Sequence, residues 1–410
     1  MPEPDHTMTP AAPRGASVAS DTSLVLATPT PASTDPTAPG AKAVSAGRQP
    51  PVSEERGAKP ARATRGAKGR GAAKSGRRAS PRARKGGSEP PSLLRQLTRI
   101  EHDGGDGILV FGEGETLAVT SLDKEFFPAD GYTKGDLMRY YVRVAPVLLP
   151  AIDGRPLTLK RYPNGIEGPS FFQHDPGDAP PEVVRVEQVM TEEGQQARLV
   201  GGDLATLLYT VQLGTVAVNA WQSRVGSLDA PDYAVLDLDP GEGAPFTRVV
   251  EVALLVKAEL EALRLRAAAK TSGSTGLHIL VPLPRRSTYD TAAALAAEVA
   301  TRVVRARPDV ATVERSIGAR PPRSVYVDHL QNARGKTLAA LLSVRARHGA
   351  TVSMPVPWSR VARPLDPRAF TLATAPRRLT KSGQEWETVM RAGNAPAVVR
   401  AATGAARRTV

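Results

Sequence analysis

Two aspartates at the end of an apolar run are the residues best suited to chemistry. The stretch Tyr233-Ala-Val-Leu-Asp-Leu-Asp-Pro240 is typical of a buried strand closed by a turn. Because strand side chains alternate between faces, Asp237 and Asp239 point to the same side. Neighbouring carboxylates repel each other unless a positive group lies between them, and a divalent cation bound through oxygen is the usual solution. A solvated turn is the alternative interpretation of this stretch alone.

A glycine-rich loop follows later in the chain. Residues 270–276, Lys-Thr-Ser-Gly-Ser-Thr-Gly, lead directly into a predicted strand that carries His278. Backbone N–H groups near Gly273 and the hydroxyls of Ser272 and Ser274 can bind phosphate, and an imidazole can donate to a phosphate oxygen. On its own, a loop of this composition is more often a flexible turn, and a single strand histidine more often has a structural role than binds a ligand.

A third acid stands at the end of another apolar, alternating run, Ser324-Val-Tyr-Val-Asp328. A cationic segment follows it and includes Lys336 and Arg345. An Asp-x-Asp strand, a glycine loop with a strand histidine, and a distant strand-end Asp328 together supply the parts of a two-metal phosphoryl-transfer site.

Composition separates a tail from the rest of the chain. The 410 residues carry a net charge of +13 and no cysteine, which excludes disulfide scaffolds, thiolate nucleophiles and Cys-ligated metals. Residues 1–91 are rich in Pro, Thr and Ala and then in Lys and Arg, so we expect a disordered tail with a basic arm for nucleic acid. We expect a catalytic domain over 92–380 and a helical or flexible tail over 381–410. No signal peptide or membrane span is predicted.

The elements that must position these residues follow from hydrophobic periodicity. A helix is predicted to begin at Thr133, which can form a capping box with Asp136. Further helices are predicted over 202–213, 246–265 and 290–305. Strands are predicted over 116–119, 155–161, 170–173, 183–189, 196–200, 216–219 and 277–282, besides the two acidic strands.

These motifs together resemble the polymerase domain of bacterial ligase D, a member of the archaeo-eukaryotic primase superfamily. The resemblance covers about Thr116 to Leu379. It rests on Leu122-Asp-Lys-Glu-Phe-Phe-Pro128, Thr133-Lys134, Lys160-Arg-Tyr-Pro-Asn-Gly165, Phe171-Phe-Gln173, Leu236-Asp-Leu-Asp-Pro-Gly241, Thr271-Ser-Gly-Ser274, Gly276-Leu-His278, Val327-Asp328 and Gln331-Asn332.

The resemblance implies a role for each matching residue. Asp237, Asp239 and Asp328 would hold two Mn²⁺ or Mg²⁺ ions and act in catalysis. Nucleotide triphosphates would be bound by Ser272, Gly273, Ser274, His278, Lys336 and Arg345. Lys124 and Lys134 would bind a DNA 5′-phosphate, and Phe171 and Phe172 would stack on bases.

The expected fold is α+β, a mixed sheet with an RRM-like palm packed against helices. The resemblance implies a primase-polymerase that favours ribonucleotides and acts at DNA ends or gaps in non-homologous end joining. A Ku-like protein and a separate DNA ligase are the expected partners, in a cytoplasmic, nucleoid-associated setting. A catalytically weak DNA-end-binding module and a metal-dependent nuclease or phosphatase are the alternatives.

Several positions depart from the family pattern at the nucleotide end of the site. Asn219 stands where histidine is common, and Ala217 replaces a usual acid. Thr275 replaces a basic residue, Leu341-Leu342 replace Pro-Tyr, and His174 replaces Lys. These changes remove polar groups that would contact the triphosphate but leave the three aspartates intact.

Overall fold

The computed structural model describes residues 90–406, and the predicted basic arm lies outside these residues. The helices are α1 (Pro90–His102), α2 (Lys134–Ile152), α3 (Leu204–Gln212), α4 (Phe246–Ala262), α5 (Tyr289–Ala306), α6 (Trp358–Val361), α7 (Ala375–Ala392) and α8 (Pro396–Ala406). The larger predicted helices are therefore confirmed. Short 3-10 turns occur at Gly112–Gly114, Pro128–Asp130, Ile317–Ala319 and Pro367–Ala369.

Strands make up five sheets in the described part of the chain. The first half contributes β1 (Gly107–Val110), β2 (Thr116–Val119), β3 (Glu125–Phe127), β4 (Tyr132–Thr133), β5 (Leu157–Arg161), β6 (Phe171–Gln173), β7 (Val186–Thr191) and β8 (Gly194–Leu199). The second half contributes β9 (Thr215–Trp221), β10 (Tyr233–Pro240), β11 (Ala268–Thr271), β12 (Leu277–Pro282), β13 (Ala311–Thr312), β14 (Val325–Asp328), β15 (Thr337–Ala339) and β16 (Pro355–Val356). Each strand predicted from the sequence is present.

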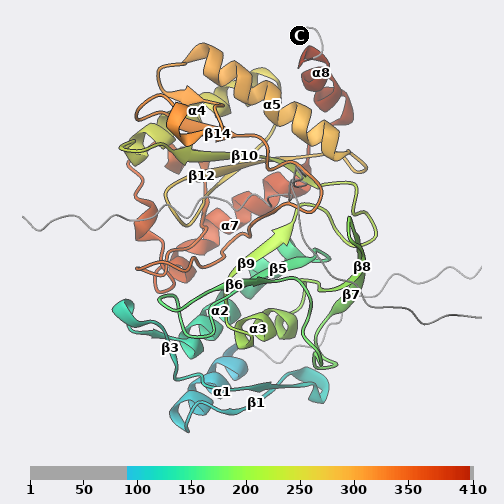
Figure 1. Cartoon of the computed structure of the whole chain (residues 1–410), viewed down its shortest axis with the longest axis vertical. Coiled ribbons are helices and arrows are strands. Elements are labelled where there is room, and N and C mark those ends of the chain that lie inside the picture. The colour runs from blue at the N-terminus through green and yellow to red at the C-terminus, as the bar shows by residue number, and fades with distance from the viewer. Residues whose placement is uncertain (1–89, 407–410) are drawn as a thin grey trace, which may run out of the picture. The chain divides into compact units, whose positions relative to one another are not determined.

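The larger sheet has the order β13-β14-β10-β12-β11-β16 and carries the predicted acids. Its pairs are antiparallel except β13–β14, so the sheet is mixed as expected. Helices α4 and α5 pack on its central strand β10 (Figure 1). Leu236 and Leu238 are fully buried, which is the reason that this run of the sequence is apolar.

The second sheet has the order β15-β9-β5-β6, with antiparallel pairing throughout. Helices α2 and α3 lie beside it, and α7 contacts both α2 and β11, which links the two sheets (Figure 1). Lys270 of β11 donates a 2.9 Å hydrogen bond to the carbonyl of Ala339 in β15. The side chains that share a face with Lys270 on the larger sheet therefore point toward the second sheet.

Helix α2 begins with the capping box that the sequence predicts. Thr133 Oγ1 accepts a 3.0 Å hydrogen bond from the Asp136 N–H, and the Asp136 carboxylate accepts from the Thr133 N–H, which completes the predicted capping box. This arrangement makes Lys134 the first residue of the helix.

The C-terminal helices extend the same core. Helix α7 crosses the expected boundary between the catalytic domain, ending at residue 380, and the C-terminal tail, and its Trp386 is buried. Helix α8 packs on α5 through Val399 and Ala402. In the described segment, no helix has both the length and the apolar character that crossing a bilayer requires.

Candidate active site

A row of four polar side chains crosses the larger sheet. Asp237 on β10 lies directly opposite Asp328 on one side and His278 on the other, and His278 in turn lies opposite Lys270. Residues that face each other across paired strands share one face of a sheet. Sheet pairing thus brings together two predicted acids, the predicted histidine and a lysine for which the sequence suggested no role.

Burial makes this row electrostatically unusual. Asp237 is 4% exposed and Asp328 is 7% exposed. Burial, and then the charge of Asp328, raises the pKa of Asp237 to about 7. Burial and the charges of Asp237 and Asp328 hold the pKa of Asp239 well above its ordinary value. The three carboxylates therefore repel one another in a poorly hydrated place, which favours binding of a cation.

One carboxylate oxygen in the row has no hydrogen bond. Asp237 Oδ1 is buried without a donor in the described chain, although His278 Nε2 lies 3.3 Å away. A buried, unpartnered carboxylate oxygen fits a hard divalent cation. Within residues 90–406, however, no three His, Asp or Glu side chains already form a metal-binding cluster. The assignment of ions to the three aspartates thus stays a prediction.

Asp328 is already held by neighbours that follow it in the chain. Its Oδ1 accepts a 2.7 Å hydrogen bond from the Leu330 N–H, and its Oδ2 accepts a 2.8 Å bond from Gln331 Nε2. The Tyr326 hydroxyl donates to Oδ1 at 3.4 Å. These bonds fix the orientation of the Asp328 carboxylate.

Lys270 is the residue that sequence reasoning missed. Its Nζ lies 2.6 Å from His278 Nδ1 and donates to Ser353 Oγ at 2.6 Å. Burial holds the pKa of Lys270 well below its ordinary value. Because Lys270 is paired with His278 only through sheet register, its contact with the site could not be read from a single sequence.

The glycine loop runs against the acidic strand. A Cβ on Gly276 would lie 2.2 Å from the Leu238 carbonyl, so only glycine fits between the loop and β10. Ser272 Oγ accepts 3.0 Å hydrogen bonds from the N–H groups of Ser274 and Gly276. Ser272 therefore shapes the loop, and Gly273 has a positive φ of 72°.

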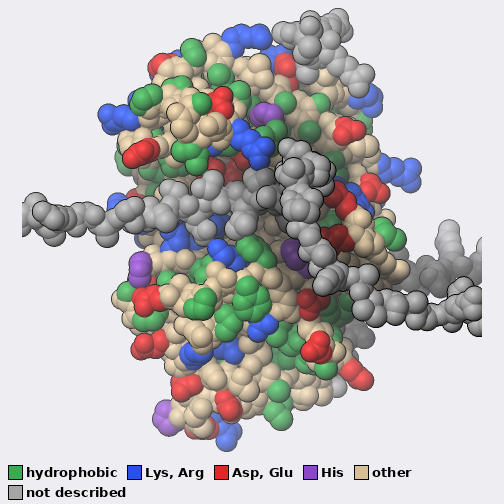
Figure 2. All heavy atoms as spheres, viewed as in Figure 1, with side chains coloured by type: hydrophobic (Ala, Val, Ile, Leu, Met, Phe, Trp, Pro, Cys, Tyr) green, Lys and Arg blue, Asp and Glu red, His purple; other side chains and the backbone are tan. Residues whose placement is uncertain are grey.

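Besides strand β10, two arginines contact the glycine loop. Arg345 Nη1 donates to the Ser272 carbonyl at 3.5 Å, and Arg347 bonds to the Ser274 hydroxyl. The charge of Arg345 also opposes the rise in the pKa of Asp237. Lys336 instead precedes β15 on the second sheet, and no hydrogen bond or ion pair among residues 90–406 joins it to the loop. Lys and Arg side chains gather near the middle of the face in Figure 2.

The two lysines predicted to bind a 5′-phosphate lie together. The Lys134 N–H donates to the Lys124 carbonyl at 2.8 Å, because the hairpin of β3 and β4 joins them. Lys124 Nζ donates to the Pro163 carbonyl at 2.7 Å, and Lys134 Nζ donates to that of Thr120 at 2.8 Å. Burial and then the charge of Lys124 lower the pKa of Lys134 to about 8, and Arg161 adds to the effect.

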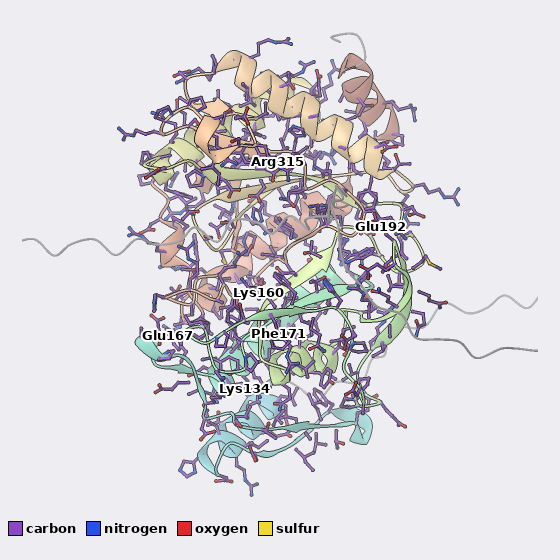
Figure 3. The ribbon with its side chains drawn as sticks, viewed as in Figure 1. Lys134, Lys160, Glu167, Phe171, Glu192 and Arg315 are labelled. Carbon is purple, nitrogen blue, oxygen red and sulfur yellow. The ribbon has the colours of Figure 1, made fainter. Side chains whose placement is uncertain are left out.

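The two predicted stacking residues lie on opposite faces of β6. Phe171 is paired with Arg161 and Phe172 with Lys160 in the strand register. The Arg161 guanidinium lies 5.2 Å from the Phe171 ring centre, and Lys160 Nζ lies 5.7 Å from that of Phe172. The rings are 48% and 43% exposed. In Figure 3, Phe171 lies between Lys160 and Lys134. The ring of Phe171 thus lies on the Arg161 side of β6, and that of Phe172 lies on the Lys160 side.

Two of the positions that depart from the family pattern make contacts within the protein. Asn219 lies on β9 opposite Thr158, and its amide donates to the Ala217 carbonyl at 3.4 Å. Leu342, another departure from the family pattern, is buried with a φ of 62°, and its carbonyl accepts from the Tyr140 hydroxyl. In this chain, both positions serve the protein's own packing and hydrogen bonding.

Comparison with known proteins agrees with this arrangement. The sequence model of the LigD primase-polymerase domain matches residues 133–386. The multifunctional non-homologous end joining protein LigD of Mycolicibacterium smegmatis is 33% identical over 252 residues, covering 61% of this chain and 33% of that protein. LigD of Pseudomonas aeruginosa is 34% identical over 257 residues, covering 62% of this chain and 30% of that protein. The chain spans about a third of the length of these relatives.

A solved structure supports the same assignment. The polymerase domain from Mycobacterium tuberculosis ligase D in complex with DNA is 32% identical, with a TM-score of 0.62. The match covers 68% of this chain and 99% of that one, and confirms the expected α+β fold. Since the family match extends over more than half of the sequence, the chain belongs to the LigD primase-polymerase domain family.

Proposed function

We propose that this chain is a DNA-directed nucleotidyltransferase that adds nucleotides at DNA ends or gaps during double-strand break repair by non-homologous end joining. The observation that carries the proposal is the direct pairing of Asp237 with Asp328 on adjacent strands, with Asp239 two residues further on the same face. Membership of a primase-polymerase family supports it. The primer 3′-hydroxyl attacks the α-phosphate of the incoming nucleotide and displaces pyrophosphate.

The carboxylates are the proposed holders of two Mn²⁺ or Mg²⁺ ions. Asp237, Asp239 and Asp328 are oxygen donors of the type that these ions prefer, and burial, together with the nearby charge of Asp328, raises the pKa of Asp237. Such ions would supply Lewis acidity to the attacking hydroxyl and the triphosphate. The protein's own contribution is to hold the three carboxylates on one face of the sheet.

The nucleotide is proposed to bind along the glycine loop. The Ser272 hydroxyl shapes this loop, Arg345 borders it, and His278 lies beside Asp237. Cationic and N–H donors at this position would neutralise the triphosphate. The preference for ribonucleotides is carried over from the family resemblance alone.

The proposed DNA substrate carries a 5′-phosphate, bound by Lys124 and Lys134. Lys134 is the first residue of α2, and its ammonium group lies beside Lys124 at the hairpin of β3 and β4, so the two positive charges can act on one phosphate. The relatives' names supply the repair setting, and a Ku-like protein and a separate DNA ligase are the proposed partners. We propose a cytoplasmic, nucleoid-associated location for this activity.

Primer extension tests the proposed function directly. The protein is incubated with a gapped duplex and with each set of ribo- or deoxynucleotides, with Mn²⁺ or Mg²⁺. We expect templated incorporation in at least one combination. Binding to gapped DNA without incorporation would favour the end-binding module. Shortening of the primer or loss of its phosphate would favour a nuclease or phosphatase.

A pH dependence of phosphate recognition follows from Lys134. Its pKa is lowered to about 8, so the side chain is charged below that pH and neutral above it. The preference for a phosphorylated over an unphosphorylated gap is therefore expected to fall between pH 7 and pH 9, whereas an ordinary lysine would stay charged to above pH 10. Fluorescence anisotropy with the two gapped duplexes measures this preference.

Lys134→Arg is the control for this pH dependence, because arginine stays charged throughout the range. The variant is expected to keep a constant preference from pH 7 to pH 9. If the parental protein shows the same constant preference, Lys134 does not contribute its charge to phosphate binding.

A further inference from the structure

Arg198 on β8 is a buried cation without an acidic partner. The residue is only 6% exposed, and in the described chain its Nε–H has no acceptor. Its one hydrogen bond runs from Nη2 to Gln196 Oε1, at 2.6 Å. Arg155, which is also buried, instead has the carboxylate of Asp232 at 2.5 Å. Leaving a buried arginine unpaired costs stability, so the position calls for a functional explanation.

The acids around Arg198 are engaged elsewhere. Glu187 lies directly opposite Arg198 in the β7–β8 register, but its carboxylate pairs with Arg185 at 2.5 Å. The carboxylates of Glu193 and Asp175 accept hydrogen bonds from other groups. Within residues 90–406, the guanidinium group thus keeps an unused Nε–H donor and forms no ion pair, and the charges of Glu193 and Asp175 act on it only from a longer range.

The surroundings of Arg198 are suited to a nucleic-acid strand. Burial, and then the charge of Arg198, lower the pKa of His174, while Glu193 and Asp175 oppose the shift, so Arg198 and His174 lie within electrostatic range of each other. His174 directly follows β6, two residues after the exposed ring of Phe172, over which Lys160 lies. Exposed aromatic rings beside cations are the usual means of binding single strands.

We propose that Arg198, assisted by His174, binds a backbone phosphate of the single-stranded template as it passes β6. A guanidinium group can donate two parallel hydrogen bonds to a phosphate, whose negative charge would form the close ion pair that Arg198 otherwise does not make within residues 90–406. This inference rests on the proposed function, since it assigns a second contact to the same DNA substrate. A nucleotide triphosphate offers the same phosphate chemistry, and the experiment separates the two sources.

The test measures binding of a primer–template with a single-stranded template overhang, by anisotropy at several salt concentrations. Arg198→Gln is expected to lower the affinity about tenfold, as for loss of a charge-assisted hydrogen bond. The slope of log affinity against log salt is expected to become shallower by about 0.7, the value for one single-strand phosphate. The KM for the nucleotide is expected to stay unchanged.

Arg185→Gln is the matched control. Arg185 lies next to the β7–β8 hairpin that carries Arg198, but it forms an ion pair with Glu187 of β7. This variant is expected to leave the affinity and the salt slope unchanged. Replacing single template phosphates by neutral methylphosphonates should weaken binding of the parental protein at one position and have no effect there on Arg198→Gln. Arg198→Met should raise Tm, because it removes a buried charge that forms no ion pair within residues 90–406.

Two results would overturn the inference. If Arg198→Gln binds the overhang as well as the parental protein and Arg198→Met lowers Tm, the arginine serves the fold alone. If the nucleotide KM rises while DNA affinity is unchanged, the phosphate belongs to the nucleotide and the template assignment is wrong. Failure of the parental protein to bind primer–template at all would instead reject the proposed function.

Discussion

Asp237→Asn is expected to lower nucleotide incorporation by about 10²–10³-fold while leaving DNA affinity within a factor of about two. Asparagine keeps the shape of the side chain but removes the charge that lies opposite Asp328 on β14. DNA affinity should be preserved because phosphate contacts come from lysine and arginine. Single-turnover primer extension and anisotropy with the same gapped duplex measure the two quantities.

The same variant has an expected effect on stability that does not depend on activity. In metal-free buffer at pH 8, removing one of the mutually repelling buried carboxylates should raise Tm, by about 2–4 °C for each kcal/mol of relieved repulsion. Added Mn²⁺ should raise the Tm of the parental protein, because an ion that binds only the folded state stabilises it. The variant should respond weakly. Near-parental extension by Asp237→Asn, or equal Mn²⁺ responses, would reject the assignment of this carboxylate.

The second large effect is expected at the lysine pair. The parental protein should bind a gap with a downstream 5′-phosphate about 10–100-fold better than the same gap without it, as for two charge-assisted contacts. Changing both Lys124→Ala and Lys134→Ala should abolish this preference while extension of an open primer continues. Competition between the two gapped duplexes, labelled with different dyes, measures the preference in one sample.

Lys257→Ala is the matched control for the lysine pair. Lys257 is a lysine of α4 that pairs with Glu261, at 2.5 Å, one helical turn away, and its loss should leave the phosphate preference unchanged. Lys134→Met keeps most of the buried stem and separates loss of charge from loss of packing. A double variant that still prefers the phosphorylated gap would show that the phosphate binds elsewhere.

Helices and strands were predicted well, because capping motifs and hydrophobic periodicity depend only on residues that are close in the sequence. The capping box of Thr133 and Asp136 and the strand Tyr233–Pro240 appear as predicted. The expected mixed sheet is also present, since alternating apolar runs identify buried strands without knowledge of their partners. The motif order then pointed to the family.

The parts of the site that depend on strand pairing were not predictable from one sequence. The contact between Lys270 and His278 follows from the register of the consecutive strands β11 and β12, and the position of Asp237 between His278 and Asp328 follows from the pairing of β10 with the distant strands β12 and β14. The separation of Phe171 and Phe172, in contrast, follows from strand alternation and could have been inferred. The missing partner of Arg198 is visible only when its neighbours are placed.

Position within a sheet also has a consequence for motion. Strand β10 is hydrogen-bonded on both sides, by β12 and β14, whereas β6 is the last strand of its sheet. Amide hydrogens around Asp237 are therefore expected to exchange with solvent only on global unfolding, while those of β6 exchange through local opening. If β6 binds DNA as proposed, this edge strand would be able to shift against differently shaped ends while the carboxylates on β10 stay in place. The less stable edge strand β6 would thus allow the protein to bind DNA ends of different shapes, and the more stable inner strand β10 would keep the carboxylates fixed at the reacting phosphate.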